Sequence, residues 1–440
     1  MAGDRNILNK KLWIDKIGVK ELQNTKICTL LLLSVMIVGI LTLSQTFSSL
    51  MSDVIIKSTG KISTTQVTAK SGSPEDIQTA VDTVEAAGGG TVYIPEGTFY
   101  WNDETVESSG GVNIIGAGPA GCDGHPDFNV YTAKTILHNN KVPPFNYMFY
   151  IDGSNHKPTR ISGIQFEGTA PVGNDDKDGI AIRVMYEITD LRVDHCTFIN
   201  FPRQAISLRN VYTGTASALV DHCVIDNPYK LESGSWIWAY GFYPGGQAYW
   251  WDDEDAPITD FLGKYPVKTG YPVMYVEDCK ISRTRHAVDG IQGAWIVARY
   301  NYIDHPYQKN YGQLEIHGSG GGSWPSGRGF EFYNNTVVGE PGYTSTELTW
   351  LRGGAGVVFN NAFIMSGGYA VGLYLETCPA QPDEVLHNVW IWNNTVSGGA
   401  LLHNVGGFTE DVDYFLRSPN QALDGFTYTP YLYPHPLTSG

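Results

Sequence analysis

The chain has 440 residues, of which 50 are glycine, 12% are aromatic and only 17% are charged. Few charges combined with many turn-forming and β-prone residues argue against a helical bundle and suit an all-β chain with tight turns. The formal net charge is −16, and the first 26 residues are basic, so the remainder is more acidic still. Such a surface repels nucleic acid, and no nucleic-acid partner is expected.

Residues 27–47 form an uncharged apolar run that predicts one transmembrane helix. At ~1.5 Å per residue the run is long enough to cross a hydrocarbon core of ~30 Å. Lys and Arg residues between Arg5 and Lys26 precede it, so 1–26 is expected to be a cytoplasmic tail and the rest of the chain extracellular. The alternative is a cleaved signal peptide, which would release a secreted protein. Residues 48–71 are polar and are interpreted as a stalk.

A helix is predicted to begin after Ser73, which is a suitable N-cap. Pro74 follows at the first helical position, and Glu75 and Asp76 place acids in the first turn. The apolar stripe of this helix consists of Ile77, Ala80, Val81 and Val84. We expect the helix to cap the N-terminal end of one repeat domain, residues 72–440, where unpaired strand edges need protection.

Seven segments between residues 193 and 398 share a pattern of a β-prone run, a Cys or Asn anchor and an apolar residue two positions later. The anchors are Cys196, Cys223, Cys279, Asn301, Asn335, Asn361 and Asn394. Their spacing is irregular, as in a solenoid whose strands superpose at ~4.8 Å while its loops vary in length. Anchors of successive coils should therefore stack, and the Asn amides should form a hydrogen-bonded ladder. The longest interval is either one coil with a long insertion or two coils.

A second strand family follows the anchors and alternates apolar with polar residues, as expected for a strand with one face in a core and one in water. Its members are 179–184, 205–210, 286–291, 314–319, 349–354 and 400–405. Two strand families that recur in step predict stacked coils of parallel strands.

The run IQTAVDTVEAAGGGTVYIPEGTFY at 77–100, followed by VNIIGAG, resembles the opening of pectate-lyase-superfamily proteins. The stretches RHAVDG, WIVARYNYI and LEIHGSG are similar to later coils of extracellular proteins of that superfamily. The resemblance covers about residues 72–400 and implies an all-β, right-handed parallel β-helix. It implies no particular reaction, because the Arg-x-Pro-x-x-Arg pattern of pectate lyases is absent and the polygalacturonase-like fragments at Asp175, Asp176 and His317 lack that family's spacing.

The second strand family directs polar side chains outward from adjacent coils, as a rigid enzyme surface for an extended sugar chain would. The candidate catalytic residues are His286, Asp289, His317 and Arg209, and Arg183 and Arg352 are candidate substrate-binding residues. A His or Arg there could act as the base of a β-elimination, with Ca²⁺ on the substrate carboxylate. The alternative is that these charges only pair with one another on a wet surface.

Residues 228–271 are interpreted as one long insertion rich in aromatic residues. Its candidate sugar-binding residues are Trp236, Trp238, Tyr240, Trp250 and Trp251, whose flat rings either stack on sugars or pack the loop onto the solenoid. The acidic run that follows contains Asp252, Asp253 and Asp255. These carboxylates either bind Ca²⁺ or are simply solvated.

Two functions remain open from the sequence. The first is a membrane-anchored extracellular polysaccharide lyase or glycoside hydrolase that acts on external glycans. The second is a non-catalytic cell-surface β-helix that binds glycan or has a structural role, because fold alone does not fix function.

Overall fold

The computed structural model describes residues 65–439 except 103, 141–146, 169–178, 187, 202–203, 210–215, 227–236, 241–257, 266–272, 292, 306–311, 320–325, 343–346 and 377–384. The predicted tail, the transmembrane segment 27–47 and most of the predicted stalk lie outside this part of the chain. Within it, no helix combines the length and the apolar character needed to cross a membrane.

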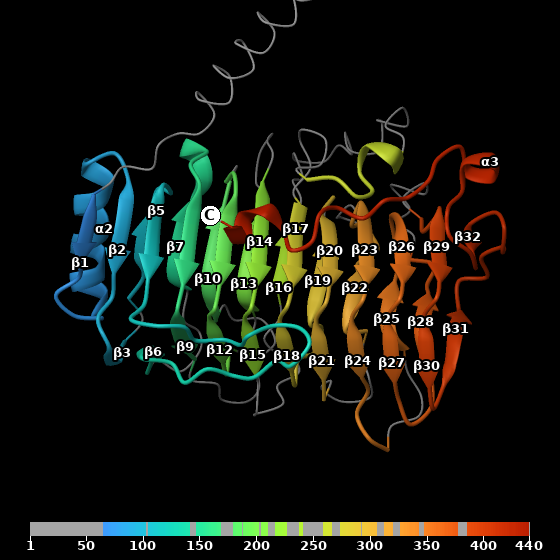
Figure 1. Ribbon diagram of the computed structural model, residues 1–440, viewed down its shortest axis with the longest axis horizontal. Coiled ribbons are helices and arrows are strands. Elements are labelled where there is room, and N and C mark those ends of the chain that lie inside the picture. Colours follow the sequence, from blue (N-terminus) through green and yellow to red (C-terminus); the bar gives the residue numbers. More distant parts are fainter. Residues whose placement is uncertain are drawn as a thin grey trace, which may run out of the picture. The chain divides into compact units, whose positions relative to one another are not determined.

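Three parallel sheets run side by side along the domain (Figure 1). Each coil contributes one strand to sheet A, then one to sheet B, then one to sheet C. The predicted all-β parallel β-helix is therefore confirmed. The strands of sheet A are β1 (Gln66–Thr68), β2 (Gly90–Tyr93), β5 (Val112–Ile115), β8 (Thr159–Ser162), β11 (Leu191–Asp194), β14 (Ser217–Asp221), β17 (Val273–Glu277), β20 (Trp295–Arg299), β23 (Gly329–Tyr333), β26 (Ala355–Phe359), β29 (Val389–Trp392) and β32 (Tyr414–Phe415).

Among the described residues, sheets B and C have ten strands each. The strands of sheet B are β3 (Gly97–Trp101), β6 (Thr135–Asn139), β9 (Ile164–Glu167), β12 (Thr197–Ile199), β15 (Val224–Asp226), β18 (Lys280–Ser282), β21 (Tyr302–Asp304), β24 (Thr336–Val338), β27 (Ala362–Ile364) and β30 (Thr395–Ser397). The strands of sheet C are β4 (Val106–Ser108), β7 (Tyr147–Asp152), β10 (Ile180–Met185), β13 (Gln204–Arg209), β16 (Ile237–Tyr240), β19 (Val288–Ile291), β22 (Leu314–Ile316), β25 (Glu347–Leu351), β28 (Tyr369–Leu373) and β31 (Ala400–Asn404). The second strand family of the sequence lies in sheet C.

The turn from sheet A to sheet B has the same form in seven successive coils. The residue before each anchor is in the left-handed region, with φ between 49° and 57°; these residues are His195, His222, Asp278, Tyr300, Asn334, Asn360 and Asn393. Asn, Asp and His tolerate this conformation better than most residues do. One left-handed residue thus bends the chain from one sheet to the next and points the following anchor into the coil.

The anchors stack along the interior edge of these turns. Asn301 Nδ2 donates to Asn335 Oδ1 at 3.0 Å, and Asn335 Nδ2 donates to Asn361 Oδ1 at 3.0 Å. Asn361 Nδ2 continues the series to Asn394 Oδ1 at 3.0 Å. Toward the N-terminus, Cys279 N donates to Asn301 Oδ1, and fully buried free thiols replace the amides in the coils that come before. The ladder fixes the register of every coil that it joins.

Helix α2 (Pro74–Ala86) caps the N-terminal end of the solenoid, as predicted (Figure 1). The Ser73 side chain accepts a hydrogen bond from Asp76 N, and the apolar stripe is buried in the main core. Strand β1 pairs with β2 and lies ahead of the expected start of the domain at residue 72. The residues of β1 show only a weak alternation of apolar and polar side chains, so the sequence alone did not predict this strand.

The interval from Cys223 to Cys279 is one coil, because β15, β16 and β17 follow one another through sheets B, C and A. The structure corrects the limits of the expected insertion. Residues 237–240 are not loop but strand β16, which pairs with β13 and β19. Their β-prone, aromatic composition favours a strand.

Residues 426–438, which we call the C-terminal strap, return across the outer face of sheet A (Figure 1). Arg299 donates to the carbonyl oxygens of Tyr431 and Leu432, each at 2.7 Å. His435 N donates to Glu277 Oε1 at 2.9 Å, and Arg192 Nη1 donates to Leu437 O at 3.0 Å. Since the strap occupies this part of sheet A, that face is not available to a ligand there.

Candidate functional site

Polar side chains gather on the outer face of sheet C, where the parallel register sets them in rows. One row runs Asp289, Glu315, Trp350, Gly372, His403 from β19 to β31. Because adjacent strands lie ~4.8 Å apart, residues from five different coils become neighbours. A second row, two positions further along each strand, contains His317, Arg352 and Tyr374, whose backbone nitrogens bond the preceding coil.

Two carboxylic acids on adjacent coils, Asp289 and Glu315, form the centre of the cluster, which we call the acid pair. Asp289 is 1% exposed and Glu315 is fully buried. Burial and the nearby Glu315 raise the pKa of Asp289 well above its usual value. Asp289 Oδ1 has no hydrogen-bond partner among the described residues. These surroundings favour the protonated form of the Asp289 carboxyl.

Glu315 has the opposite environment. Burial alone would raise its pKa, but Arg352 and His286 overcome that effect and hold the pKa of Glu315 well below its usual value. Arg352 Nη2 contacts Glu315 Oε1, and His286 Nδ1 lies 2.5 Å from Glu315 Oε2. The same His286 nitrogen is 2.6 Å from Gly312 O. Glu315 is thus a carboxylate beside a protonated acid.

The rim of the cluster reaches solvent. Arg352 Nη1 lies 3.1 Å from Glu376 Oε2, and the side chains of Arg352 and Glu376 are 16% and 27% exposed. His317 is 26% exposed, with its Nδ1 3.9 Å from the same Glu376 oxygen. Burial and the charge of Arg352 lower the pKa of His317, so this ring is neutral near pH 7. The cluster therefore meets solvent at these three residues, while the acid pair itself is buried.

The predicted catalytic residues are brought together only in part. His286, Asp289 and His317 belong to the cluster, and Arg352, expected to bind substrate, is at its centre. Arg209 lies in β13, in register with Tyr240 of β16 and so two strands from β19; nothing further is described for its side chain.

Arg183 does not join the cluster. It lies in β10, three strands before β19 in sheet C. Its Nη1 donates to Ser207 Oγ at 2.9 Å, and its guanidinium lies 5.6 Å from the ring centroid of Tyr147. These contacts are local to the N-terminal half of the sheet.

The predicted aromatic and metal-binding residues are only partly covered by the structure. Trp238 and Tyr240 belong to β16, and Trp238 is in register with Asp289. Trp236, Trp250, Trp251 and the acidic run Asp252, Asp253 and Asp255 lie outside the described residues, so the Ca²⁺ site stays a prediction. In the part of the chain that is described, no three His, Cys, Asp or Glu side chains are grouped as a metal site requires.

Sequence reasoning did not select Glu315 and Glu376 as site residues. A signal existed for Glu315, because the alternation of LEIHGS directs it outward. Aligning that run with HAVDGI puts His317 beside Asp289, however, whereas the observed register pairs Asp289 with Glu315. No comparable signal existed for Glu376, which follows the end of β28. It reaches Arg352 only because of the fold.

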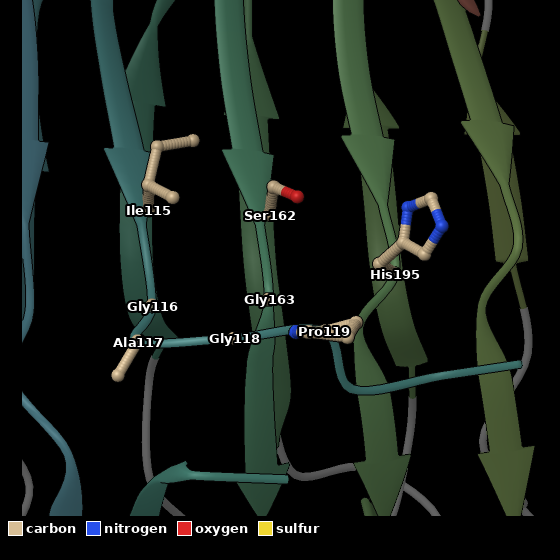
Figure 2. A pocket seen from close by; sticks show the side chains of 8 residues that line it. All are labelled: Ile115, Gly116, Ala117, Gly118, Pro119, Ser162, Gly163 and His195. Atoms are coloured by element: carbon tan, nitrogen blue, oxygen red, sulfur yellow. The ribbon is translucent and has the colours of Figure 1, made fainter. Parts of the chain in front are cut away.

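A shallow pocket of about 320 Å³ lies elsewhere, at the turns that follow β5, β8 and β11 (Figure 2). Glycine backbone and the side chains of Ile115, Ala117, Pro119, Ser162 and His195 line it. Ser162 Oγ donates to Asp194 Oδ2, and His195 Nδ1 lies 2.8 Å from the same oxygen. Because Asp194 engages the polar groups at its edge, this pocket offers less chemistry than the acid pair.

No protein-family model matches the chain, and no curated protein matches its sequence. Solved structures similar to it include a mutant of the tailspike protein of Escherichia coli bacteriophage HK620 in complex with a pentasaccharide, at 13% identity and a TM-score of 0.44, over 77% of this chain and 56% of that one. The catalytic unit of a GH87 α-1,3-glucanase from Streptomyces thermodiastaticus matches at 11% identity and a TM-score of 0.42, over 77% and 66%. The mannuronan C-5 epimerase AlgE4 A-module of Azotobacter vinelandii matches at 12% identity and a TM-score of 0.31, over 76% and 94%. With TM-scores below 0.5, these likenesses carry no conclusion about activity.

Proposed function

We propose that the chain is a glycan-acting enzyme that hydrolyses glycosidic bonds on the outer face of sheet C. One observation carries this proposal: Asp289 and Glu315 lie in register on adjacent coils, with Asp289 Oδ1 unpaired among the described residues and Glu315 in contact with Arg352 and His286. These different surroundings push the pKa values of the two carboxyl groups apart. Hydrolysis of a glycosidic bond needs such a pair, one acid to protonate the leaving oxygen and one carboxylate on the other side of the bond.

In this mechanism Asp289 donates its proton to the glycosidic oxygen as the bond to the anomeric carbon breaks. Glu315 remains ionised because Arg352 and His286 contact it. Its carboxylate either attacks the anomeric carbon or removes a proton from the attacking water. Water supplies the hydroxyl group to the new reducing end and returns the proton lost by the acid, so the enzyme is regenerated.

Elimination is the competing reaction, and the same cluster supports it less well. A β-elimination needs a base at the proton beside the uronate carboxylate and a cation on that carboxylate. Neutral His317 could serve as the base. Arg352, the cation beside His317, is already shared between Glu315 and Glu376, so it is poorly placed to neutralise an added carboxylate.

The test uses the purified full chain and a panel of polysaccharides, with and without Ca²⁺. New reducing ends without absorbance near ~235 nm indicate hydrolysis, whereas an absorbing product indicates elimination. Asp289→Asn and Glu315→Gln should each lower the rate by at least ~100-fold. The matched control is Glu167→Gln, on β9 of sheet B, which should retain activity. Glycan binding that survives both substitutions, with no turnover by the wild type, would instead identify a non-catalytic binding protein.

We also propose that residues 27–47 anchor the chain in a membrane with the β-helix outside the cell. The uncharged run preceded by basic residues supports this placement. Membrane fractionation and protease accessibility of intact cells test it. Release of the β-helix into the medium would show that the segment is cleaved.

A further inference from the structure

The coils on the C-terminal side of the acid pair carry an aromatic platform, which we define as Trp350, Tyr374, Tyr369 and His403. These residues come from β25, the end of β28, β28 and β31, and all four are partly exposed. Trp350 is the in-register neighbour of Glu315. The platform therefore begins directly beside the acid pair and continues along the axis of the solenoid.

Trp350 is held rigidly. Its Nε1 donates to Glu347 Oε2 at 3.2 Å, and its ring centroid lies 5.7 Å from that of His286. The guanidinium of Arg352 lies 5.6 Å from the indole centroid. A Cβ on Gly312 would come within 2.4 Å of the indole, so the ring packs directly against that backbone. A fixed, partly exposed indole is suited to stacking on the apolar face of a sugar ring.

Glu347 links platform residues that come from three coils. Its Oε1 lies 2.5 Å from His403 Nδ1, and the His403 ring stacks on Tyr369 at 4.3 Å and 16°. Gly372 separates Trp350 from His403 in the row. A Cβ there would come within 2.8 Å of both Glu347 and Tyr374. Because Gly372 has no side chain, Glu347 and Tyr374 can pack over β28 at this point, and the platform continues across it.

The charges around this surface disfavour an acidic sugar. Four carboxyl groups lie along it: Asp289, whose uncharged form is favoured, and the carboxylates of Glu315, Glu347 and Glu376. Arg352 already contacts two of them, and His403 is paired with a third. A uronate carboxylate placed here would meet like charges at close range in a partly buried setting, where repulsion is strong.

Resting on the function proposed above, we infer that the site takes an uncharged sugar chain, whose rings lie on the aromatic platform along β25, β28 and β31, and not a polyuronate. The platform binds sugar faces by stacking. Glu347, which is 4% exposed, sets the positions of Trp350 and His403 rather than reacting.

The experiment measures binding separately from turnover. The full-length chain carrying Asp289→Asn, which removes the proposed acid and keeps the charge of Glu315, is titrated calorimetrically with neutral and uronic-acid oligosaccharides of increasing length. We expect neutral oligosaccharides to bind and to gain affinity with length. Adding Trp350→Ala should weaken that affinity roughly tenfold, whereas Tyr100→Ala, an exposed aromatic of β3 in sheet B, should leave it unchanged.

The outcomes separate the two proposals. Equal or tighter binding of uronic-acid oligosaccharides would overturn the inference, even if the wild type proves to be a hydrolase. Neutral binding that depends on Trp350, with no hydrolysis by the wild type, would support the inference and refute the proposed reaction. Neutral binding that is insensitive to Trp350→Ala would overturn the platform as the binding surface.

Discussion

Glu315→Gln should lower the pKa of the neighbouring Asp289, and this change can be measured directly. The substitution keeps the size of the side chain and removes one negative charge beside Asp289. For charges on strands ~4.8 Å apart, an effective dielectric constant of ~20 gives about 3.5 kcal/mol, or about 2.5 pKa units. Glutamine also leaves Arg352 less neutralised, and this acts in the same direction. The pKa of Asp289 should therefore fall by about 2 units or more.

The assay is a ¹³C NMR titration of the full chain labelled at aspartate carboxyl carbons, with Asp289→Asn used to assign the signal. Glu167→Gln on sheet B is the control and should leave the titration of Asp289 unchanged. A pKa of Asp289 that moves by less than ~0.5 unit in Glu315→Gln would mean that the two carboxyl groups do not sense each other. The acid–base assignment would then lose its physical basis.

The other predictions concern pH and the supports of the solenoid. Because Asp289 must be protonated to act, kcat/KM should fall as pH rises through the raised pKa of this acid, and initial rates across pH check this. Asn335→Ala should cost about 1–3 kcal/mol in urea unfolding, because it leaves buried ladder groups unpaired. Arg299→Met should cost about 3–5 kcal/mol by the same measure, because Glu277 remains buried without its cation. Although burial would raise the pKa of Asp194, ionic hydrogen bonds hold it low. The contribution of ionised Asp194 to the free energy of unfolding is therefore present above the unfolded pKa of ~3.9 and is lost as pH falls. The difference in that free energy between wild type and Asp194→Asn should accordingly narrow below about pH 4.

The solenoid could be predicted from the sequence because the residues that determine it lie close together in the chain and recur from coil to coil. The Asn and Cys anchors repeat, and all but Asn301 follow an Asn, Asp or His, which tolerate the left-handed conformation. The helix start at Ser73 is equally local, and its cap forms as predicted. By contrast, β1 and β16 were not among the strands predicted from the repeats, and their pairing with neighbouring coils identifies them.

Only part of the candidate site could be predicted from the sequence, for a related reason. Outward alternation identified His286, Asp289 and Arg352, but which outward residues meet depends on the register between coils. Glu315 pairs with Asp289 through such a register, and Glu376 arrives from beyond a strand end. The protonation states of side chains are harder still to predict from the sequence. The raised pKa of Asp289 and the lowered pKa of Glu315 follow from burial and partners, which the order of residues does not contain.

The two-residue link between sheets A and B has a consequence for how this protein can change. From β11 to β30 that link keeps one length, while the links from B to C and from C to A differ from coil to coil. Segments at those two corners can thus be lengthened or replaced without shifting the stack, since added loop length costs little. Exchanging such segments between solenoids of this kind should alter what the outer face of sheet C recognises while the scaffold still folds. The corner occupied by the anchors should reject even a single added residue.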